Sequence, residues 1–158
     1  MDKKVDVNVK PVMPPLDDLL FATTLFVRDA CLCLHVQRAA RSLARRYDEA
    51  LRPVGLTSGQ FSLLMSLNRP EPPNIASVAA LLAMDRTTLT ANLKPLERRG
   101  LIEVGQRKTD KRQRTLTLTP SGRATLVAAV PIWERTHAAL ESLVGSADQL
   151  RGDLMALT

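Results

Sequence analysis

Two groups of polar side chains in the second half of the chain have the chemistry that recognition of double-stranded DNA requires. An arginine can donate two hydrogen bonds to guanine, an asparagine can pair with adenine, and a threonine can meet a thymine methyl group or a phosphate. Arginine also suits the narrow, negative minor groove. The first group, at the start of a predicted helix, is Arg86, Thr87, Thr88, Thr90, Asn92 and Lys94, and the second, in a predicted turn, is Arg107, Lys108, Lys111 and Arg112.

The segment that contains both groups also carries the chain's excess of positive charge. Between Arg86 and Arg114 there are nine Lys or Arg residues and three acidic residues, so the segment has a net charge of +6, equal to the formal net charge of the whole chain. A local excess of this kind is typical of a surface that binds a polyanion. A basic face that is merely solvated would give the same count, so charge alone does not decide.

The composition argues against several other classes of protein. Aromatic residues make up 3% of the 158 residues, so alanine and leucine must do most of the packing, which favours helices. No apolar run is long enough to span a membrane and the N-terminus does not resemble a signal peptide, so we expect a cytoplasmic protein without a membrane partner. The chain has two histidines, no visible nucleophile arrangement and no glycine-rich phosphate loop, so we expect no enzymatic activity and no cofactor.

The spacing of apolar residues predicts a long helix ahead of the charged segment. Residues 1–24 form a leader in which prolines oppose early helix formation. Over residues 28–52, apolar side chains recur at steps of three and four, as on one face of an amphipathic helix. Pro53 and Gly55 should end this helix. We therefore assign residues 25–55 to a dimerisation helix.

Three short helices should follow, each opened by a polar N-cap. Leucines at helical spacing should face inward along the third, which leaves its first turns exposed. A proline should kink that helix and a glycine should end it. The predicted helices are the one opened by the Thr57–Gln60 capping box, residues 75–83 after Asn74, and residues 86–99 after Asp85, with Leu89, Leu93 and Leu96 inward, Pro95 at the kink and Gly100 at the end.

After Gly100 the apolar period changes from near 3.6 to two, which predicts a β-hairpin. Ile102 and Val104 alternate with polar residues on the first strand, as do Leu116 and Leu118 on the second. The sequence Thr119-Pro120 then predicts the start of another helix. That helix should run to about Val144 with a kink at Pro131, and a capping box of Ser146 and Gln149 should open a last short helix.

This order of elements predicts a mainly α-helical fold with a small β-hairpin wing, a winged helix-turn-helix. In such a fold one short helix props the next, whose N-terminal residues enter the major groove. We assign residues 56–119 to the DNA-binding domain and residues 120–158 to C-terminal dimerisation helices. A twofold copy should cover the apolar faces of the terminal helices, so a homodimer should bind a pseudo-palindromic operator. The residues expected to meet the partner are Leu126, Val130, Leu140, Leu150, Leu154 and Leu157.

The chain resembles the MarR (multiple antibiotic resistance regulator) family from about Cys31 to the C-terminus. The matching string that starts at Ile75 is I-x-x-V-A-x-L-L-x-M-D-R-T-T-L-T-x-x-L-x-x-L-E-R-R-G-L-I, and D-x-R-x-x-x-L-x-L-T-x-x-G starts at Asp110. The resemblance implies a triangular dimer, a recognition helix in the major groove, and Arg112 in the minor groove with Asp110 as its brace. From the residues alone, these two would also fit an ordinary surface pair worth under about 1 kcal/mol.

The resemblance also implies an effector cavity between the dimer helices and the DNA-binding lobe. We therefore expect a sequence-specific transcriptional regulator, a repressor that a small-molecule effector releases or modulates. Candidate residues for the cavity are Arg38, Arg41, Tyr47, Trp133 and His137. The simpler interpretation makes the two large aromatic residues part of the core and the arginines a solvated stripe.

Two alternative functions stay open. In the peroxide-sensing branch of the family, a cysteine near the start of the first long helix is the sensor, and Cys31 lies near that place. Those sensors surround the thiol with tyrosines, whereas this chain has only Tyr47, so simple packing of Cys31 competes with a redox role.

The other alternative is a winged helix that binds a protein instead of DNA. Zinc needs three or four ligands, and although Cys31 or His35 could join His137 across a dimer, we expect no metal site.

Overall fold

The computed structural model of the protein describes residues 20–107 and 110–158, and the side chains of residues 20–106 and 114–158. The predicted leader up to residue 19 and the turn at residues 108 and 109 lie outside this part. The same holds for the wing side chains with a predicted role in DNA contact or bracing, which are Arg107, Lys108, Asp110, Lys111 and Arg112. The chain divides into two units, one up to Leu43 and one from Ala44 onward.

The first unit contains helix α1 (Phe21–Ala30) and the beginning of α2 (Leu32–Leu51). The prediction of a single helix from residue 28 is wrong, because the chain is already helical from Phe21, inside the predicted leader. The prolines of the leader all precede Phe21, so they do not oppose this helix. Cys31 separates the two helices with an extended backbone (φ −74°, ψ 106°).

In the second unit, α2 ends and α3 begins at the residues that the sequence predicts. A short 3-10 turn, η1 (Arg52–Val54), follows α2 and leads into Gly55, whose left-handed backbone (φ 66°) completes the stop. Thr57 and Gln60 form the predicted capping box of α3 (Ser58–Leu67), and the two backbone N–H groups donate to the partner side chains at 3.1 and 3.2 Å. The sequence therefore predicts both boundaries correctly.

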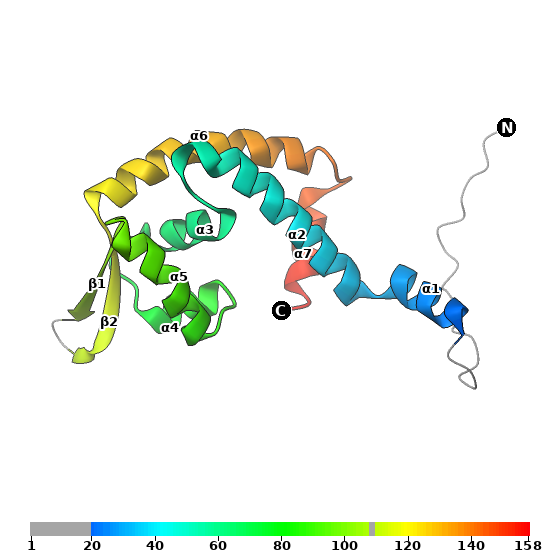
Figure 1. Cartoon of the computed structure of the whole chain (residues 1–158), viewed down its shortest axis with the longest axis horizontal. Helices are drawn as coiled ribbons and strands as arrows, with labels where there is room; N and C mark the ends of the chain where they lie inside the picture. The colour runs from blue at the N-terminus through cyan, green and yellow to red at the C-terminus, as the bar shows by residue number, and fades with distance from the viewer. Residues whose placement is uncertain (1–19, 108–109) are drawn as a thin grey trace. The chain divides into compact units, whose positions relative to one another are not determined.

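The N-caps predicted for the two following helices are also confirmed. Asn74 accepts a hydrogen bond from the Ser77 N–H (2.8 Å) at the start of α4 (Ile75–Leu81). Asp85 caps α5 (Arg86–Arg98), and this helix continues through Pro95. The two helices contact each other, and α5 leads directly into the hairpin (Figure 1).

The predicted hairpin consists of β1 (Ile102–Arg107) and β2 (Asp110–Leu118), which pair antiparallel. Ile102 lies opposite Leu118 and Val104 lies opposite Leu116, so the apolar residues share one face as their alternation predicts. A short bridge on the other side of β2, which the sequence pattern did not indicate, extends the hairpin. Pro73 accepts a hydrogen bond from the Leu116 N–H (3.0 Å), and Asn74 bridges Thr115, within a stretch that its prolines mark as loop.

A leucine-rich core holds the short helices and the hairpin together. The inward face of α5 packs into this core, and each fully buried leucine contributes about 1.5–3 kcal/mol. Because α5 and the hairpin share the core, their outward faces are held in fixed relation. The members with the least exposure are Leu51, Leu63, Leu64, Val78, Leu89, Leu96, Ile102, Leu116 and Ala129.

The last two helices are α6 (Pro120–Glu141) and α7 (Ala147–Met155). α6 ends three residues before the predicted Val144. Ser146 caps α7 by accepting the Gln149 N–H (3.2 Å), but the predicted box does not close, because the Gln149 side chain donates to Asp153 instead (2.8 Å). None of the helices in the described part of the chain is both long and apolar enough to cross a membrane.

One residue of the predicted partner-facing set belongs to the protein's own core. Leu126 is only 4% exposed and packs with the core leucines, because α6 contacts α3 and the hairpin. It is therefore not free to meet a partner, and that prediction is wrong. Leu150, Leu154 and Leu157 remain 40–63% exposed, and Leu143 is also exposed. Exposed apolar side chains thus remain toward the end of the chain, and others, such as Phe21 and Leu32, lie on α1 and α2.

A joint of three hydrogen bonds connects the end of α5, the hairpin and α6. The Thr119 hydroxyl donates to the Gly100 carbonyl (2.6 Å) and accepts from the Gly122 N–H (2.9 Å). The Thr119 N–H donates to the Leu101 carbonyl (3.1 Å). At Gly122 the backbone of α6 comes so close that an added Cβ would lie 1.9 Å from the Leu101 oxygen. This close approach explains the glycine of the L-T-x-x-G string.

We predict that Gly122→Ala lowers the free energy of unfolding by about 2 kcal/mol or more, because the new methyl group must push two backbone segments apart. Gly59→Ala is the matched control, since no atom lies within 4 Å of its added Cβ and alanine favours the helix by up to about 1 kcal/mol. Urea denaturation of both variants at one protein concentration measures the difference. Equal stability of the two variants would contradict the close approach.

Candidate nucleic-acid interface

The turn between α4 and α5 is tight and contains a residue in an unfavourable conformation. Ala83 has φ 50°, the left-handed region that residues with a Cβ rarely adopt. The Ala83 N–H donates to the Ala80 carbonyl (3.2 Å) and the Met84 N–H donates to the Ala79 carbonyl (2.9 Å), which closes the end of α4. The helix therefore ends at Leu81, before the predicted residue 83, because alanine at the turn gives no sequence signal of a stop.

Asp85 fixes the start of α5 with two hydrogen bonds to the same residue. One carboxylate oxygen accepts the Thr88 N–H (2.8 Å), and the other accepts the Thr88 hydroxyl (2.6 Å). These bonds to Thr88 hold the pKa of the Asp85 carboxyl below its usual range. The first turn of α5 is thereby held in one conformation before it meets any ligand.

The predicted contact residues of α5 lie on its outward side, opposite the buried leucines. Arg86, Thr87, Thr88, Asn92 and Lys94 are exposed, whereas Thr90 is half-buried. Local hydrogen bonds already engage the hydroxyls of Thr88 and Thr90. The Thr90 hydroxyl donates to the Arg86 carbonyl (2.7 Å), and the Thr88 hydroxyl donates to Asp85. Their methyl groups therefore suit contact with DNA better than their hydroxyls do.

A further cation beside the predicted contact residues, Arg114, lies midway along β2. Arg114 is exposed and lies opposite Gln106 in the register of the two strands. It lines a hollow of about 300 Å³ between α5 and the hairpin, together with Lys94 and Glu97 of α5. Its place could have been inferred from the strand alternation, because Arg114 is two residues from Leu116 and four from Leu118.

Three of the residues proposed for an effector cavity come together in the second unit. Trp133 stacks on Phe61 (6.1 Å between ring centroids, 18° between planes) and on His137 (4.5 Å, 12°). The Tyr47 hydroxyl lies 3.3 Å from His137 Nδ1. Burial raises the pKa of the Tyr47 phenol, and the charge of Glu141 adds to this effect. The other two candidates, Arg38 and Arg41, are exposed residues of the first unit.

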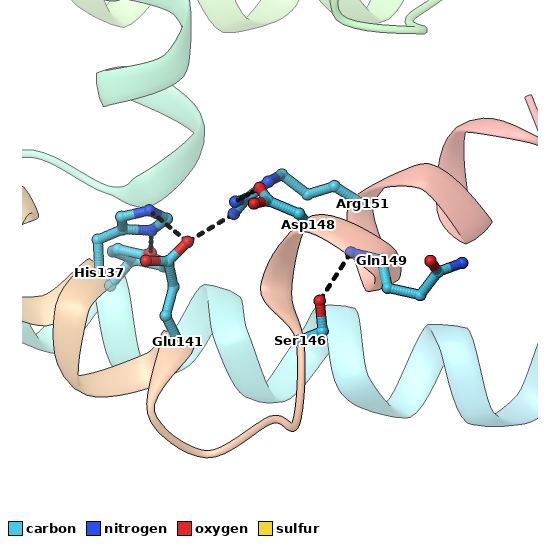
Figure 2. A network of polar contacts seen from close by, with 7 residues as sticks. His137, Glu141, Ser146, Asp148, Gln149 and Arg151 are labelled. Carbon is cyan, nitrogen blue, oxygen red and sulfur yellow. Dashed lines mark hydrogen bonds and ion pairs between the residues drawn. The ribbon is translucent and has the colours of Figure 1, made fainter.

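A polar network extends from this aromatic cluster to the last helix (Figure 2). His137 Nε2 lies 3.1 Å from Glu141 on α6, and Arg151 on α7 donates to Glu141 at 2.6 Å and to Asp148 at 2.5 Å. The hydrogen bond from Arg151 holds the pKa of the Glu141 carboxyl below its usual range. The network therefore ties α7 to the part of α6 that carries His137.

A mainly apolar hollow of about 450 Å³ lies beside the same cluster. Trp133 and Val130 of α6 line one part of it, and Leu81 and Leu82 at the end of α4 line another. Because Leu82 directly precedes Ala83, the hollow borders the turn that places α5. The remaining residues that line it belong to α3 and are Phe61, Ser62, Met65 and Ser66.

The two cysteines occupy different environments near the break between α1 and α2. Cys31 is half-buried, and its sulfur lies 3.5 Å from the Leu34 N–H. Cys33 is exposed, and its sulfur accepts a hydrogen bond from the Gln37 side chain (3.2 Å). Among the residues with described side chains, no three His, Cys, Asp or Glu residues are grouped so that they could hold a metal ion.

Comparison with known proteins adds independent information about this arrangement. The sequence model of the MarR family matches residues 56–113. HTH-type transcriptional regulator SarZ of Staphylococcus haemolyticus is 29% identical over 102 residues, which cover 62% of this chain and 69% of SarZ. The family match includes the capped helices α3 to α5, strand β1 and the beginning of β2.

Two solved structures extend the similarity over most of the chain. The transcriptional regulator MosR of Mycobacterium tuberculosis, crystallised in complex with DNA, is 40% identical with a TM-score of 0.75, over 80% of this chain and 92% of MosR. The transcriptional repressor CouR, bound to p-coumaroyl-CoA, is 29% identical with a TM-score of 0.74, over 83% of this chain and 94% of CouR.

We predict that the Asp85 carboxylate makes a pH-dependent contribution to stability. Because folding lowers its pKa, this contribution is fully present above the ordinary carboxyl pKa, about 3.9, and is lost as the pH falls through the lower folded value. Asp85→Asn, an uncharged cap of the same shape, should therefore melt below the wild type at neutral pH and approach it below about pH 4. A difference in melting temperature that stays constant down to pH 3 would contradict this role.

Proposed function

The chain belongs to the MarR family, and on that premise we propose that it is a cytoplasmic, non-enzymatic transcriptional regulator that binds specific sequences of double-stranded DNA. One observation carries the proposal. The first turns of α5, held by the Asp85 cap, expose Arg86, Thr87 and Asn92 beside a β-hairpin that shares their core. The structure of MosR in complex with DNA supports this role, since it is similar over most of the chain.

In this proposal α5 reads the major groove and the wing reaches the neighbouring minor groove. Arg86 and Asn92 supply the hydrogen bonds that distinguish guanine and adenine, while Thr87 and Lys94 contact methyl groups and phosphates. Arg112 enters the minor groove with Asp110 as its brace. The remaining wing cations, Arg107, Lys108 and Lys111, attract the duplex and neutralise its backbone.

The protein acts as a homodimer in this proposal, because apolar side chains on α7 and just after α6 and α7 are exposed. Leu143 and Leu157 are each more than 60% exposed, and Leu150 and Leu154 are also exposed. Single apolar residues on a surface are ordinary, but several on consecutive segments favour a protein partner. A twofold copy would cover them and place two α5 helices on a pseudo-palindromic operator.

A small-molecule effector releases or modulates the DNA complex in this proposal, which makes the protein a repressor. Support comes from the hollow beside Trp133, which borders both α6 and the turn before α5. The structure of CouR, a repressor bound to p-coumaroyl-CoA, gives a precedent among similar proteins. Tyr47 and His137 lie behind Trp133 and can position its ring.

A thiol switch at Cys31 is the second candidate mechanism of release. The observation in its favour is that Cys31 is half-buried at the break between two helices, where a change at sulfur could move either one. The alternative function, binding of a protein instead of DNA, is less favoured, because the net charge of +6 between Arg86 and Arg114 suits a polyanion.

The decisive experiment enriches binding sequences from a random duplex pool and maps the protected bases by footprinting. We predict a two-part protected site with half-sites about one helical turn apart, bound at least a thousandfold more tightly than random DNA. Arg112→Ala should weaken binding and reduce its salt dependence without changing the mass of the dimer. Equally tight binding to all duplexes would contradict sequence-specific regulation.

Release can be tested on the same complex with two kinds of treatment. A thermal-shift screen of small acids, phenols and thioesters identifies ligands, and the fluorescence of Trp133, the single tryptophan of the chain, reports whether they bind near it. Treatment with an organic hydroperoxide tests the alternative, with Cys31→Ser as the control. Release by hydroperoxide in the wild type but not in this variant would favour the thiol switch.

A further inference from the structure

The core-facing surface of the hairpin changes from apolar to polar at one cross-strand pair. Leu116 and Leu118 are buried on β2, and Arg114 shares their face because side chains two residues apart point the same way. On β1 the same alternation places Gln106 on the face of Val104. The register pairs Gln106 with Arg114, so a polar pair continues the row that apolar residues begin.

The pair of Gln106 and Arg114 lies beside α5, so it does not face open solvent alone. α5 contacts β1, and Lys94 and Thr90 of α5 line the same hollow of about 300 Å³ as Gln106 and Arg114. Lys94 lies two helical turns after the exposed Arg86. The hollow therefore lies between the helix and the wing, the two elements proposed to contact DNA.

The charges that line the hollow favour an anion. Lys94 and Arg114 are cationic, and Glu97 is the single acid among the described residues that line the hollow. The ion pairs among the described side chains involve Arg28, His137 and Arg151, so neither cation of the hollow is paired with Glu97 within 4.0 Å. Lys94 and Arg114 are both exposed, and long cationic side chains keep their charged ends accessible even where their stems pack, so both charges are available to an anion.

We propose that this hollow holds one phosphate group of the DNA backbone, with Arg114 and Lys94 as its cationic contacts and Gln106 as a neutral donor. The proposal rests on the function proposed above and adds a contact to it. A guanidinium can donate two parallel hydrogen bonds to a phosphate, and the lysine adds a point charge. A phosphate held from both elements fixes the angle at which α5 and the wing enter their grooves, without reading sequence.

The first test measures affinity against salt concentration for an enriched duplex and for random DNA. Arg114→Gln should weaken both complexes by about tenfold per half-site and reduce the salt slope by about two per dimer, because one phosphate contact is lost in each subunit. Arg114→Lys should keep the slope of the wild type. Arg135→Gln, which removes an exposed cation of α6 that does not line the hollow, is the matched control and should leave the slope unchanged.

The second test identifies the phosphate itself. Duplexes with one neutral methylphosphonate at each position in turn should include one position per half-site that weakens the wild type but not Arg114→Gln. Glu97→Gln should tighten binding about threefold and be sensitive to the same position, because it removes a negative charge beside the phosphate.

The outcomes separate this proposal from the function on which it rests. If the wild type fails to prefer any duplex, the proposed function itself is wrong. If the wild type is specific while Arg114→Gln keeps its affinity and salt slope, the phosphate contact is overturned. The phosphate contact is also overturned if Arg114→Gln lowers the salt slope but no single methylphosphonate position weakens the wild type more than this variant. Arg114 would then act on the DNA only through its long-range charge. Circular dichroism melts of each variant confirm that folding is unchanged.

Discussion

The arrangement of the DNA-binding lobe depends on the joint at Thr119. Its hydroxyl donates to the Gly100 carbonyl and accepts from the Gly122 N–H, while its own N–H donates to the Leu101 carbonyl. These bonds tie the end of α5, the hairpin and the start of α6 at one point, and an added Cβ at Gly122 would leave no room for them. The exposed charges of α5 and Arg114 of the hairpin are therefore carried by elements that are fixed relative to one another before DNA is present, which lowers the entropic cost of binding.

The same helix that begins at this joint also carries the aromatic cluster. α6 runs from Pro120 past Trp133 and His137 to Glu141, where Arg151 attaches α7. The hollow beside Trp133 borders α4 just before Ala83, whose left-handed backbone is costly for an alanine. A ligand that moves either side of this hollow can thus change the position of α5 without touching DNA. This gives the proposed effector a direct mechanical route to the recognition helix.

Much of this fold follows from local signals, and the differences have identifiable causes. Caps such as Thr57 and Asp85 act within a few residues, so their sequence pattern is sufficient to predict helix starts. Ala83 gives no such signal, because alanine is not a usual residue for the left-handed turn that local hydrogen bonds close at the end of α4. Leu126 was assigned to a partner, since periodicity shows that a face is apolar but not what covers it. The contribution of Arg114 to the hollow depends on how the hairpin packs against α5, a contact between segments separated in sequence.

The central claim is that the joint at Thr119 orients the DNA-contacting elements. The most direct measurement is the ratio of affinities for an enriched operator and for random duplex in Thr119→Val, which keeps the shape of the side chain but removes both hydroxyl hydrogen bonds, with Thr119→Ser as the comparison. The account predicts that the valine variant stays dimeric but loses most of this ratio, while the serine variant keeps it. A valine variant that discriminates as well as the wild type would contradict the account.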